Sequence, residues 1–321
     1  MLETETVLDR RRLRRSLSLW RGLGVAGLAL AIGALVLGGD KLATLSGKKQ
    51  IARIAIEGTI MESRDQLKML KEIAEADHVA GVLLYVNSPG GTTTGGEAIY
   101  ESLREIGKKK PVVAQFGTVA ASAGYIVGLA SDHIVARGNT ITGSVGVIVQ
   151  WPEFAQLMEK IGIKVNEVKS GPLKAAPSPF APMDDASRKV TEGMVSDGFT
   201  WFIGLVEDRR GIKVAAVPGL LEGGIFSGRE ALAAKLIDEI GGEDEAVKWL
   251  KDVKNVDKDA KVVDWSPSSG PSFGIGSMTS RAVSGIFGEQ AGKIAAFLTR
   301  DSTFSSLGLD GLVSVWHPSD K

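Results

Sequence analysis

Residues 82–91 read Val-Leu-Leu-Tyr-Val-Asn-Ser-Pro-Gly-Gly, and this stretch indicates the class of fold. Its first five residues form a continuous apolar run of strand length, which is typical of a strand buried on both faces. Pro-Gly-Gly is a turn sequence, and after it Ile99, Leu103 and Ile106 recur at helical spacing. A buried strand, a glycine turn and a helix in this order predict an α/β unit with a largely parallel sheet.

Short apolar runs and apolar positions with helical spacing alternate along most of the chain. Further strand patterns cover residues 51–56, 112–116 and 133–136. Helix patterns cover residues 67–74, the segment opened by 118–125, and residues 190–206, 229–236 and 243–251. We therefore predict one α/β domain over residues 51–256.

The remaining residues, 257–321, form a predicted C-terminal extension. Residues 257–277 are rich in Ser, Gly and Pro, so we expect a linker or surface excursion there. Residues 278–298 could form an amphipathic helix that packs on the domain, contacts another subunit or lies on a membrane surface.

The first fifty residues predict a membrane anchor. Six arginines between positions 10 and 21 precede an uncharged run at 22–39, whose helical length of about 27 Å approaches the hydrocarbon thickness. We predict a basic cytoplasmic N-terminus at 1–21, a transmembrane helix at 22–39 and a linker at 40–50. By the positive-inside rule, the rest then faces the periplasm or cell exterior of a bacterium. A cleaved signal peptide is the alternative, because Ala43–Ser46 resembles a weak cleavage site.

Composition excludes some classes of function. The chain has 38 Lys and Arg against 38 Asp and Glu, and this zero net charge argues against nucleic-acid binding, which needs a basic face. The absence of cysteine fits an oxidising compartment without requiring one. His78, His133 and His317 are scattered and lack the spacing of metal ligands, so we expect no metal or other cofactor.

A serine, a lysine and a glycine turn suggest chemistry. Ser122 follows a strand and precedes an apolar helical segment, and no acidic residue lies between Lys174 and Asp184. A neutral lysine can take the proton of a serine hydroxyl, and burial favours that state by lowering the lysine pKa. Taken singly, Ser122 could be a helix N-cap, Gly90–Gly91 an ordinary turn and Lys174 a solvated side chain. Together they predict a serine hydrolase that needs no histidine.

Several motifs in order resemble the bacterial signal peptide peptidase A family, in its short, single-repeat, membrane-anchored form. They are Asn87–Gly91, Ala121–Tyr125, Thr142–Val147, Lys169–Lys174 and Phe226–Ala231. The resemblance covers residues 51–242 and implies a fold shared with the proteolytic subunit of Clp protease and with crotonases, built from ββα units. It also implies a Ser/Lys dyad, with Ser122 as nucleophile and Lys174 as general base.

The resemblance implies three further site residues. Ser144 would orient the lysine amine, and the backbone N–H groups of Gly90 and Ala123 would form the oxyanion hole. The chain has Ala123 where many relatives have glycine, and we expect little cost unless φ must be positive there.

The substrates implied are remnant signal peptides in the membrane and other apolar peptides, cleaved through an acyl-enzyme. Short family members form homo-oligomeric rings, with an octamer favoured, in which adjacent subunits complete each active site. Alternatives are a related protease acting on other membrane proteins, a Clp-like Ser/His/Asp peptidase using His133, a crotonase-type acyl-CoA enzyme, and a catalytically silent membrane scaffold.

Overall fold

The computed structural model describes residues 20, 24, 27, 49–267 and 313–315. The chain divides into two compact units, residues 1–49 and 50–321. The predicted anchor at 22–39 lies outside the described residues apart from Gly24 and Gly27, and the helix predicted at 278–298 lies wholly outside them. Within the described part of the chain, no helix is long and apolar enough to cross a membrane.

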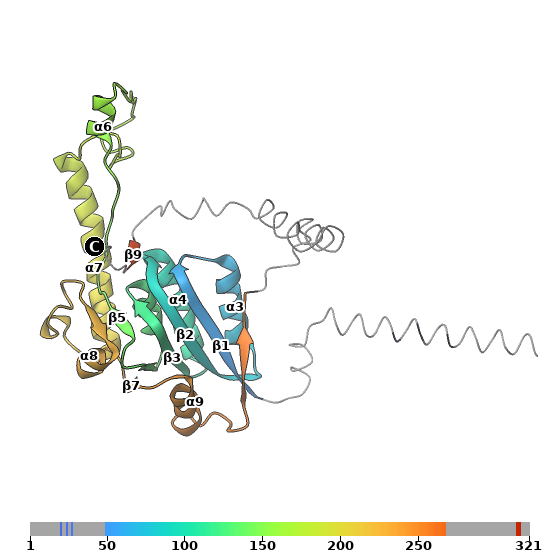
Figure 1. The fold of residues 1–321 in the computed structure, drawn as a ribbon. Coiled ribbons are helices and arrows are strands. Elements are labelled where there is room, and N and C mark those ends of the chain that lie inside the picture. The colour runs from blue at the N-terminus through green and yellow to red at the C-terminus, as the bar shows by residue number, and fades with distance from the viewer. Residues whose placement is uncertain (1–19, 21–23, 25–26, 28–48, 268–312, 316–321) are drawn as a thin grey trace, which may run out of the picture. The chain divides into compact units, whose positions relative to one another are not determined.

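Nine strands of the described residues form one mixed sheet in the second unit (Figure 1). They are β1 (Gln50–Ile60), β2 (Val79–Thr92), β3 (Val112–Ala121), β4 (His133–Ala136), β5 (Ile141–Gly143), β6 (Ile225–Ser227), β7 (Glu239–Ile240), β8 (Lys261–Trp265) and β9 (Val313–Val315). The main path runs β6–β5–β3–β2–β1–β8, with β4 beside β3, β7 beside β4 and β9 beside β2. The β5–β6 and β2–β9 pairs are antiparallel, and the other pairs are parallel, as the sequence predicts.

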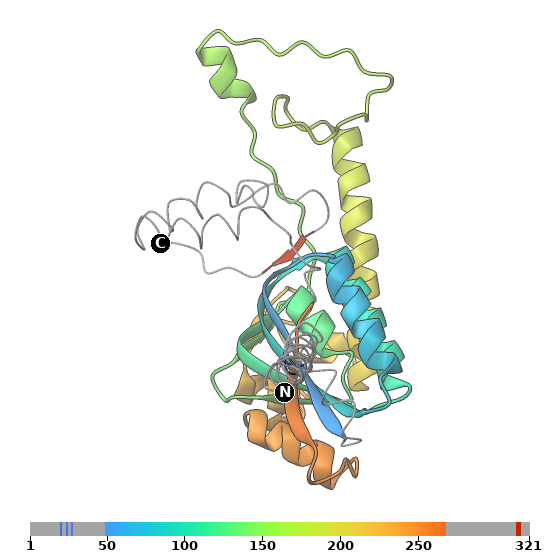
Figure 2. The ribbon, with the colours of Figure 1, turned by 90° about the vertical axis from the view of Figure 1, so that its right-hand side faces the viewer.

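Helices cover both faces of this sheet (Figures 1 and 2). The helices among the described residues of this unit are α3 (Arg64–Glu75), α4 (Thr93–Gly107), α5 (Ala123–Gly128), α6 (Ala155–Lys160), α7 (Asp185–Arg210), the 3-10 turn η1 (Val214–Ala216), α8 (Gly228–Ala233) and α9 (Glu243–Asp252). Because strand side chains alternate, Val82 and Leu84 of β2 join the core that includes α3, α4 and α5, while Leu83 joins the core that includes α9. This double burial explains the continuous apolar run at 82–86.

The prediction for residues 257–277 is wrong in part, because Lys261–Trp265 form β8. This strand pairs in parallel with the first half of β1, and Asp264 forms an ion pair with Arg53 of β1. Edge strands are often short and charged, which protects them from pairing with other chains. Because Lys261 and Asp264 are charged, the apolar run in β8 is too short for the sequence pattern to identify the strand.

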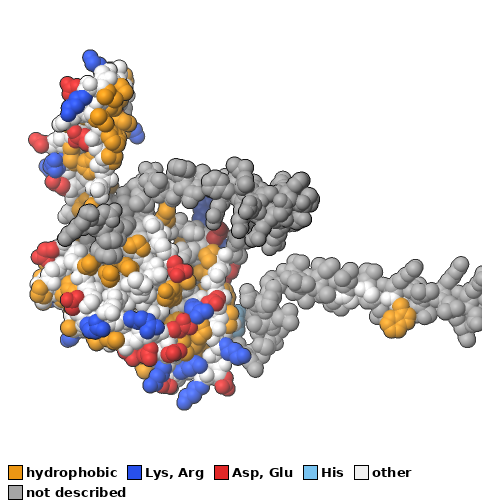
Figure 3. Space-filling view, viewed as in Figure 1, with side chains coloured by type: hydrophobic (Ala, Val, Ile, Leu, Met, Phe, Trp, Pro, Cys, Tyr) orange, Lys and Arg blue, Asp and Glu red, His pale blue; other side chains and the backbone are white. Residues whose placement is uncertain are grey.

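Residues 149–194, here called the extension, contain α6, the loop after it and the first turns of α7. Figures 1 and 2 show this part of the chain projecting beyond the sheet. Ten of its large apolar side chains have exposed fractions of at least 43%; they are Phe154, Leu157, Ile161, Ile163, Val165, Val168, Leu173, Phe180, Val190 and Met194. Figure 3 shows hydrophobic side chains gathered on the projecting part. A surface of this kind marks an interaction site.

Candidate active site

Two serines lie together where β3 and β5 end. In the parallel β3–β5 ladder Ala121 pairs with Gly143, so the next residues of each segment, Ser122 and Ser144, are neighbours. Both line one cavity of about 440 Å³. The carboxyl ends of parallel strands are the usual place for binding sites in α/β proteins. The structure thus brings Ser122 and Ser144 into one site.

The backbone at both serines is strained. Ser122 has φ 58° and Ser144 has φ 51°, values that non-glycine residues rarely adopt. Such residues cost about 1–3 kcal/mol each and persist only where their surroundings fix them. The Ser122 N–H donates to the Gly143 carbonyl (2.9 Å), and the Ser144 N–H donates to the Gly224 carbonyl (2.8 Å). These two bonds hold Ser122 to the end of β5 and Ser144 to the residue before β6.

Ser122 does not behave as an ordinary helix cap. An N-cap residue normally has an extended backbone, and its side chain accepts a bond from the first helical turn. Ser122 precedes α5 with φ 58° and ψ −121°, and its hydroxyl makes no capping bond to that helix. Among the described residues, Ala123 is not one of those with positive φ, so alanine fits there. The N-cap explanation of Ser122 is therefore wrong.

The glycine turn at 87–91 is held by Ser88. Its fully buried hydroxyl donates to the Gly58 carbonyl (2.6 Å) and accepts the N–H of Gly90 (3.1 Å). Gly90 has φ 121°, which favours glycine. In this structure the predicted oxyanion donor Gly90 N–H thus has an acceptor within the protein.

The start of α5 packs tightly on that turn. A Cβ atom on Gly124 would lie 2.9 Å from the Ser88 carbonyl oxygen, and one on Gly96 would lie 3.2 Å from the Ala123 Cβ. Only glycine allows the first approach without a shift. Close packing therefore brings Ala123, the other predicted oxyanion donor, against the segment that follows Gly90 and Gly91.

The cavity beside Ser122 is lined by apolar and polar groups in similar measure. Its walls are the residues after β5, the middle of α7 and the loop before β6; they comprise Val145, Gly146, Val147, Ile148, Val195, Phe199, Leu221, Glu222 and Gly223. Sequence reasoning placed Phe199 in an apolar helical stripe without linking it to Ser122, and it missed Val195 and Leu221. The stripe was the only signal, because the segments that complete the cavity with Phe199, at Ser122, Ser144–Ile148 and Leu221–Gly223, lie in other parts of the sequence.

Lys174 does not line the cavity beside Ser122. It lies in the loop between α6 and α7, is exposed, and is not among the residues that line the Ser122 cavity. The structure therefore brings together Ser122 and Ser144 but does not add Lys174 to that cavity.

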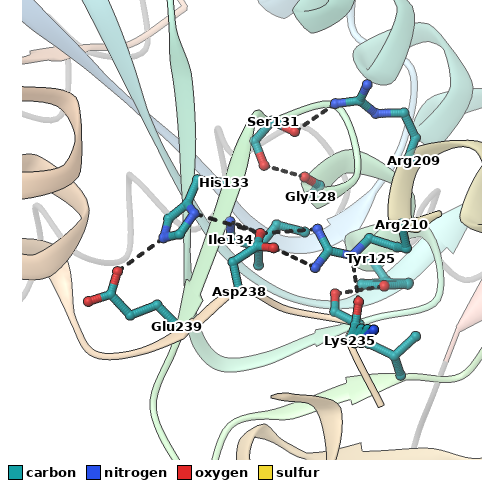
Figure 4. A network of polar contacts seen from close by, with 11 residues as sticks. Tyr125, Gly128, Ser131, His133, Ile134, Arg209, Arg210, Lys235, Asp238 and Glu239 are labelled. Carbon is teal, nitrogen blue, oxygen red and sulfur yellow. Dashed lines mark hydrogen bonds and ion pairs between the residues drawn. The ribbon is translucent and has the colours of Figure 1, made fainter. Parts of the chain in front are cut away.

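His133 lies far from Ser122. It pairs with Val113 at the start of β3, while Ser122 follows the end of that strand, roughly 25–30 Å along extended chain. Its Nε2 lies 3.0 Å from a Glu239 oxygen, and its ring stacks on Trp249 at 4.8 Å between centroids. His133 is thus part of a separate polar cluster (Figure 4).

That cluster stabilises the fold. Two bonds join Arg210 to Asp238, at 2.7 and 3.0 Å, and Asp238 also accepts the Ile134 N–H. Burial raises the pKa of Asp238, but the bonds from Arg210 and Ile134 outweigh this effect and hold the pKa below its usual range. Burial raises the pKa of the Tyr125 hydroxyl, which donates to the Leu236 carbonyl. The Clp-like triad with His133 as base is therefore wrong for this chain.

Comparison with known families agrees with this architecture. The sequence profile of peptidase family S49 matches residues 104–257, and that of Clp protease matches residues 48–144. These matches cover the segments that carry Ser122 and Ser144.

Three relatives illustrate the similarity. The putative protease slr0021 of Synechocystis sp. is 34% identical over 221 residues, covering 68% of this chain and 79% of its own. The putative signal peptide peptidase SppA of Enterococcus faecium is 34% identical over 234 residues, covering 68% of each. Protease 4 of Haemophilus influenzae is 32% identical over 239 residues, covering 71% of this chain and 38% of its own. The chain therefore belongs to peptidase family S49, the signal peptide peptidase A family, and is a serine protease with an α/β ClpP-like fold.

Proposed function

We propose that this protease uses Ser122 as nucleophile and Lys174 as general base. The observation that carries the proposal is the position of Ser122, on a strained strand-to-helix turn that lines a cavity of about 440 Å³. A strained turn of this kind presents a nucleophile to substrate in other hydrolases. Ser144, adjacent to Ser122 across the β3–β5 ladder, would orient the lysine amine.

The reaction is acyl transfer. The neutral lysine amine takes the Ser122 proton as the hydroxyl oxygen attacks a peptide carbonyl, and it then gives the proton to the departing amine. Ala123 N–H suits the oxyanion because the first amides of a helix have no acceptor four residues earlier. Gly90 N–H would contribute by exchanging or sharing its bond to Ser88. Water then hydrolyses the acyl-enzyme with the same base.

A neighbouring subunit would supply the lysine. Lys174 lies on the extension, whose exposed apolar side chains suit burial against another copy of the chain. A head-to-tail contact that repeats by rotation closes into a ring. We favour an octameric homo-oligomer, in which each extension delivers Lys174 to the next Ser122.

The substrates would be apolar peptides, including signal-peptide remnants, because six of the eleven residues that line the cavity beside Ser122 are aliphatic or aromatic. We further propose that residues 22–39 anchor the protein in the bacterial cell membrane, with residues 1–21 cytoplasmic and the protease domain outside. The support is the arginine cluster before the apolar run. Reporter fusions at Met1 and Lys321 test this topology; a reporter at Lys321 that is active in the cytoplasm would refute it.

Mixing two inactive variants tests the dyad and the shared site together. Ser122→Ala and Lys174→Ala should each abolish hydrolysis of a fluorogenic apolar peptide, while Lys169→Ala, which loses the ion pair to Glu167, should stay active. In a one-to-one mixed assembly, about one quarter of sites would pair an intact serine with a neighbour's intact lysine.

Recovered turnover would therefore support the shared site. No recovery in assemblies shown to exchange subunits would refute it. Substantial turnover by Lys174→Ala alone would refute the dyad, and labelling of Ser122 by a fluorophosphonate would still report the nucleophile separately.

A further inference from the structure

One acidic residue lines the cavity that also contains Ser122. Of the eleven described residues that line this cavity, Glu222 alone carries a charge, while six have aliphatic or aromatic side chains. Within the part of the chain that the structure describes, the Glu222 carboxylate forms neither a hydrogen bond nor an ion pair. In such a pocket the few polar groups determine which ligand binds. Glu222 is therefore available to a substrate group of opposite charge.

The turn that carries Glu222 is held firmly and is joined to the proposed active site. The Gly224 N–H donates to the Gly219 carbonyl at 2.8 Å, and a Cβ on Gly224 would lie 2.6 Å from the same oxygen. Leu220 in this turn is fully buried. The Gly224 carbonyl accepts the Ser144 N–H at 2.8 Å. The turn therefore fixes the Glu222 backbone relative to Ser144, which is the rigid support that a specificity residue needs.

The cavity runs from a buried inner end to an exposed rim. Ser122 and Val145 are buried. Ile148, Leu221 and Glu222, by contrast, are exposed. A substrate residue whose carbonyl carbon lies at Ser122 would therefore extend its side chain along the cavity walls towards Glu222. Lys and Arg suit this path, because each has an aliphatic stem that packs on apolar groups and a cationic head that stays in water.

We propose that Glu222 selects substrates with Lys or Arg as the residue whose carbonyl carbon Ser122 attacks. This specificity rests on the proposed function and adds one basic position to its apolar peptides. An exposed ion pair is weak and is screened by salt. At low ionic strength we therefore expect a preference of about fivefold in kcat/KM over an uncharged side chain of the same shape.

Two fluorogenic peptides that differ by one charge test the proposal. Each has an apolar sequence that ends, before the scissile bond, in Arg or in its uncharged isostere citrulline. The wild-type assembly should cleave the Arg peptide with a kcat/KM about fivefold higher, and Glu222→Gln should bring this ratio to about one. Glu222→Lys should reverse the preference, because like charges repel. Each ratio is measured within one variant, so a loss of folded protein cancels.

Asp197→Asn is the matched control. Asp197 is an exposed acid on α7, the helix that also carries Val195 and Phe199, but it does not line the cavity. Its replacement should leave the ratio near five.

Equal cleavage of the two peptides by the wild-type assembly, an unchanged ratio in Glu222→Gln, or an equal loss in Asp197→Asn would overturn the proposal while the proposed function stands. If the wild-type assembly hydrolyses neither these peptides nor a wholly apolar one, the proposed function is refuted, and this specificity with it.

Discussion

Replacing Ser88 with alanine tests whether its hydroxyl fixes the glycine turn beside Ser122. The hydroxyl is fully buried, donates to the Gly58 carbonyl at 2.6 Å and accepts the Gly90 N–H at 3.1 Å. Alanine leaves both backbone groups without this partner. Gly58 is exposed, so water can replace the lost bond to its carbonyl, whereas the Gly90 N–H is buried and is left unsatisfied. Such a group costs about 1–3 kcal/mol, and we expect the free energy of unfolding to fall by about that amount.

Ser131→Ala is the matched control. Ser131 is also buried, and its hydroxyl donates to one carbonyl, that of Gly128, at 2.6 Å. The Gly128 carbonyl still accepts the Ser131 N–H at 3.1 Å in this variant, so we expect a smaller destabilisation, about 0.5–1.5 kcal/mol. Urea unfolding followed by fluorescence of the six tryptophans measures both values.

Peptide hydrolysis distinguishes a positioning role of the Ser88 hydroxyl from a role in stability alone. If the hydroxyl holds the turn for catalysis, Ser88→Ala should lower kcat about tenfold at nearly unchanged KM under conditions where the protein is folded. Ser131→Ala should leave kcat unaltered. Equal kcat in the two variants would show that Ser88 only stabilises the fold. A stability loss below about 1 kcal/mol in Ser88→Ala would refute the predicted cost of losing its hydrogen bonds.

Phe199→Ala should enlarge the cavity beside Ser122 and raise kcat/KM for bulkier apolar peptides about tenfold relative to smaller ones. If the ratio of the two kcat/KM values stays unchanged, this cavity does not bind the substrate side chain. Gly128→Ala places a Cβ 2.4 Å from the Phe116 ring and should cost about 1–3 kcal/mol, so an unchanged urea midpoint would contradict it. Asp238→Asn should cost about 2 kcal/mol at pH 7. Because the folded-state pKa of Asp238 lies below its ordinary 3.8, this stabilisation is complete above that value and lost as pH falls through the folded value. A difference that stays constant into strong acid would refute the assignment.

The central sheet was predictable because its strands are buried on both faces. The apolar run at 82–86 and the strand patterns at 51–56 and 112–116 correspond to β2, β1 and β3, and the serine block does open α5. β5 and β6 have three residues each, too few for a pattern to emerge. β5 and β6 contribute the register that places Ser144 beside Ser122, and this register is set by pairing between segments far apart in sequence.

The site was predictable only where local sequence determines it. Ser122 and the glycine turn follow strands that the pattern identifies. The surroundings of Lys174 are different, because neighbouring residues in sequence do not determine what packs around a side chain on an exposed loop. The lack of nearby acids therefore predicted a buried base, whereas the single chain leaves Lys174 exposed.

The two halves of the proposed dyad thus depend on different levels of structure. The position of Ser144 beside Ser122 requires the β3–β5 register. Gly143 packs so closely on Phe226 that a Cβ would lie 2.7 Å from the ring, and this packing leaves the register little freedom to shift. The nucleophile side is therefore formed within one folded chain. Under the proposed mechanism the base side forms only when an apolar extension docks on a neighbour. A free subunit would then keep a shaped serine site without its base, so activation would follow assembly while peptide binding could precede it.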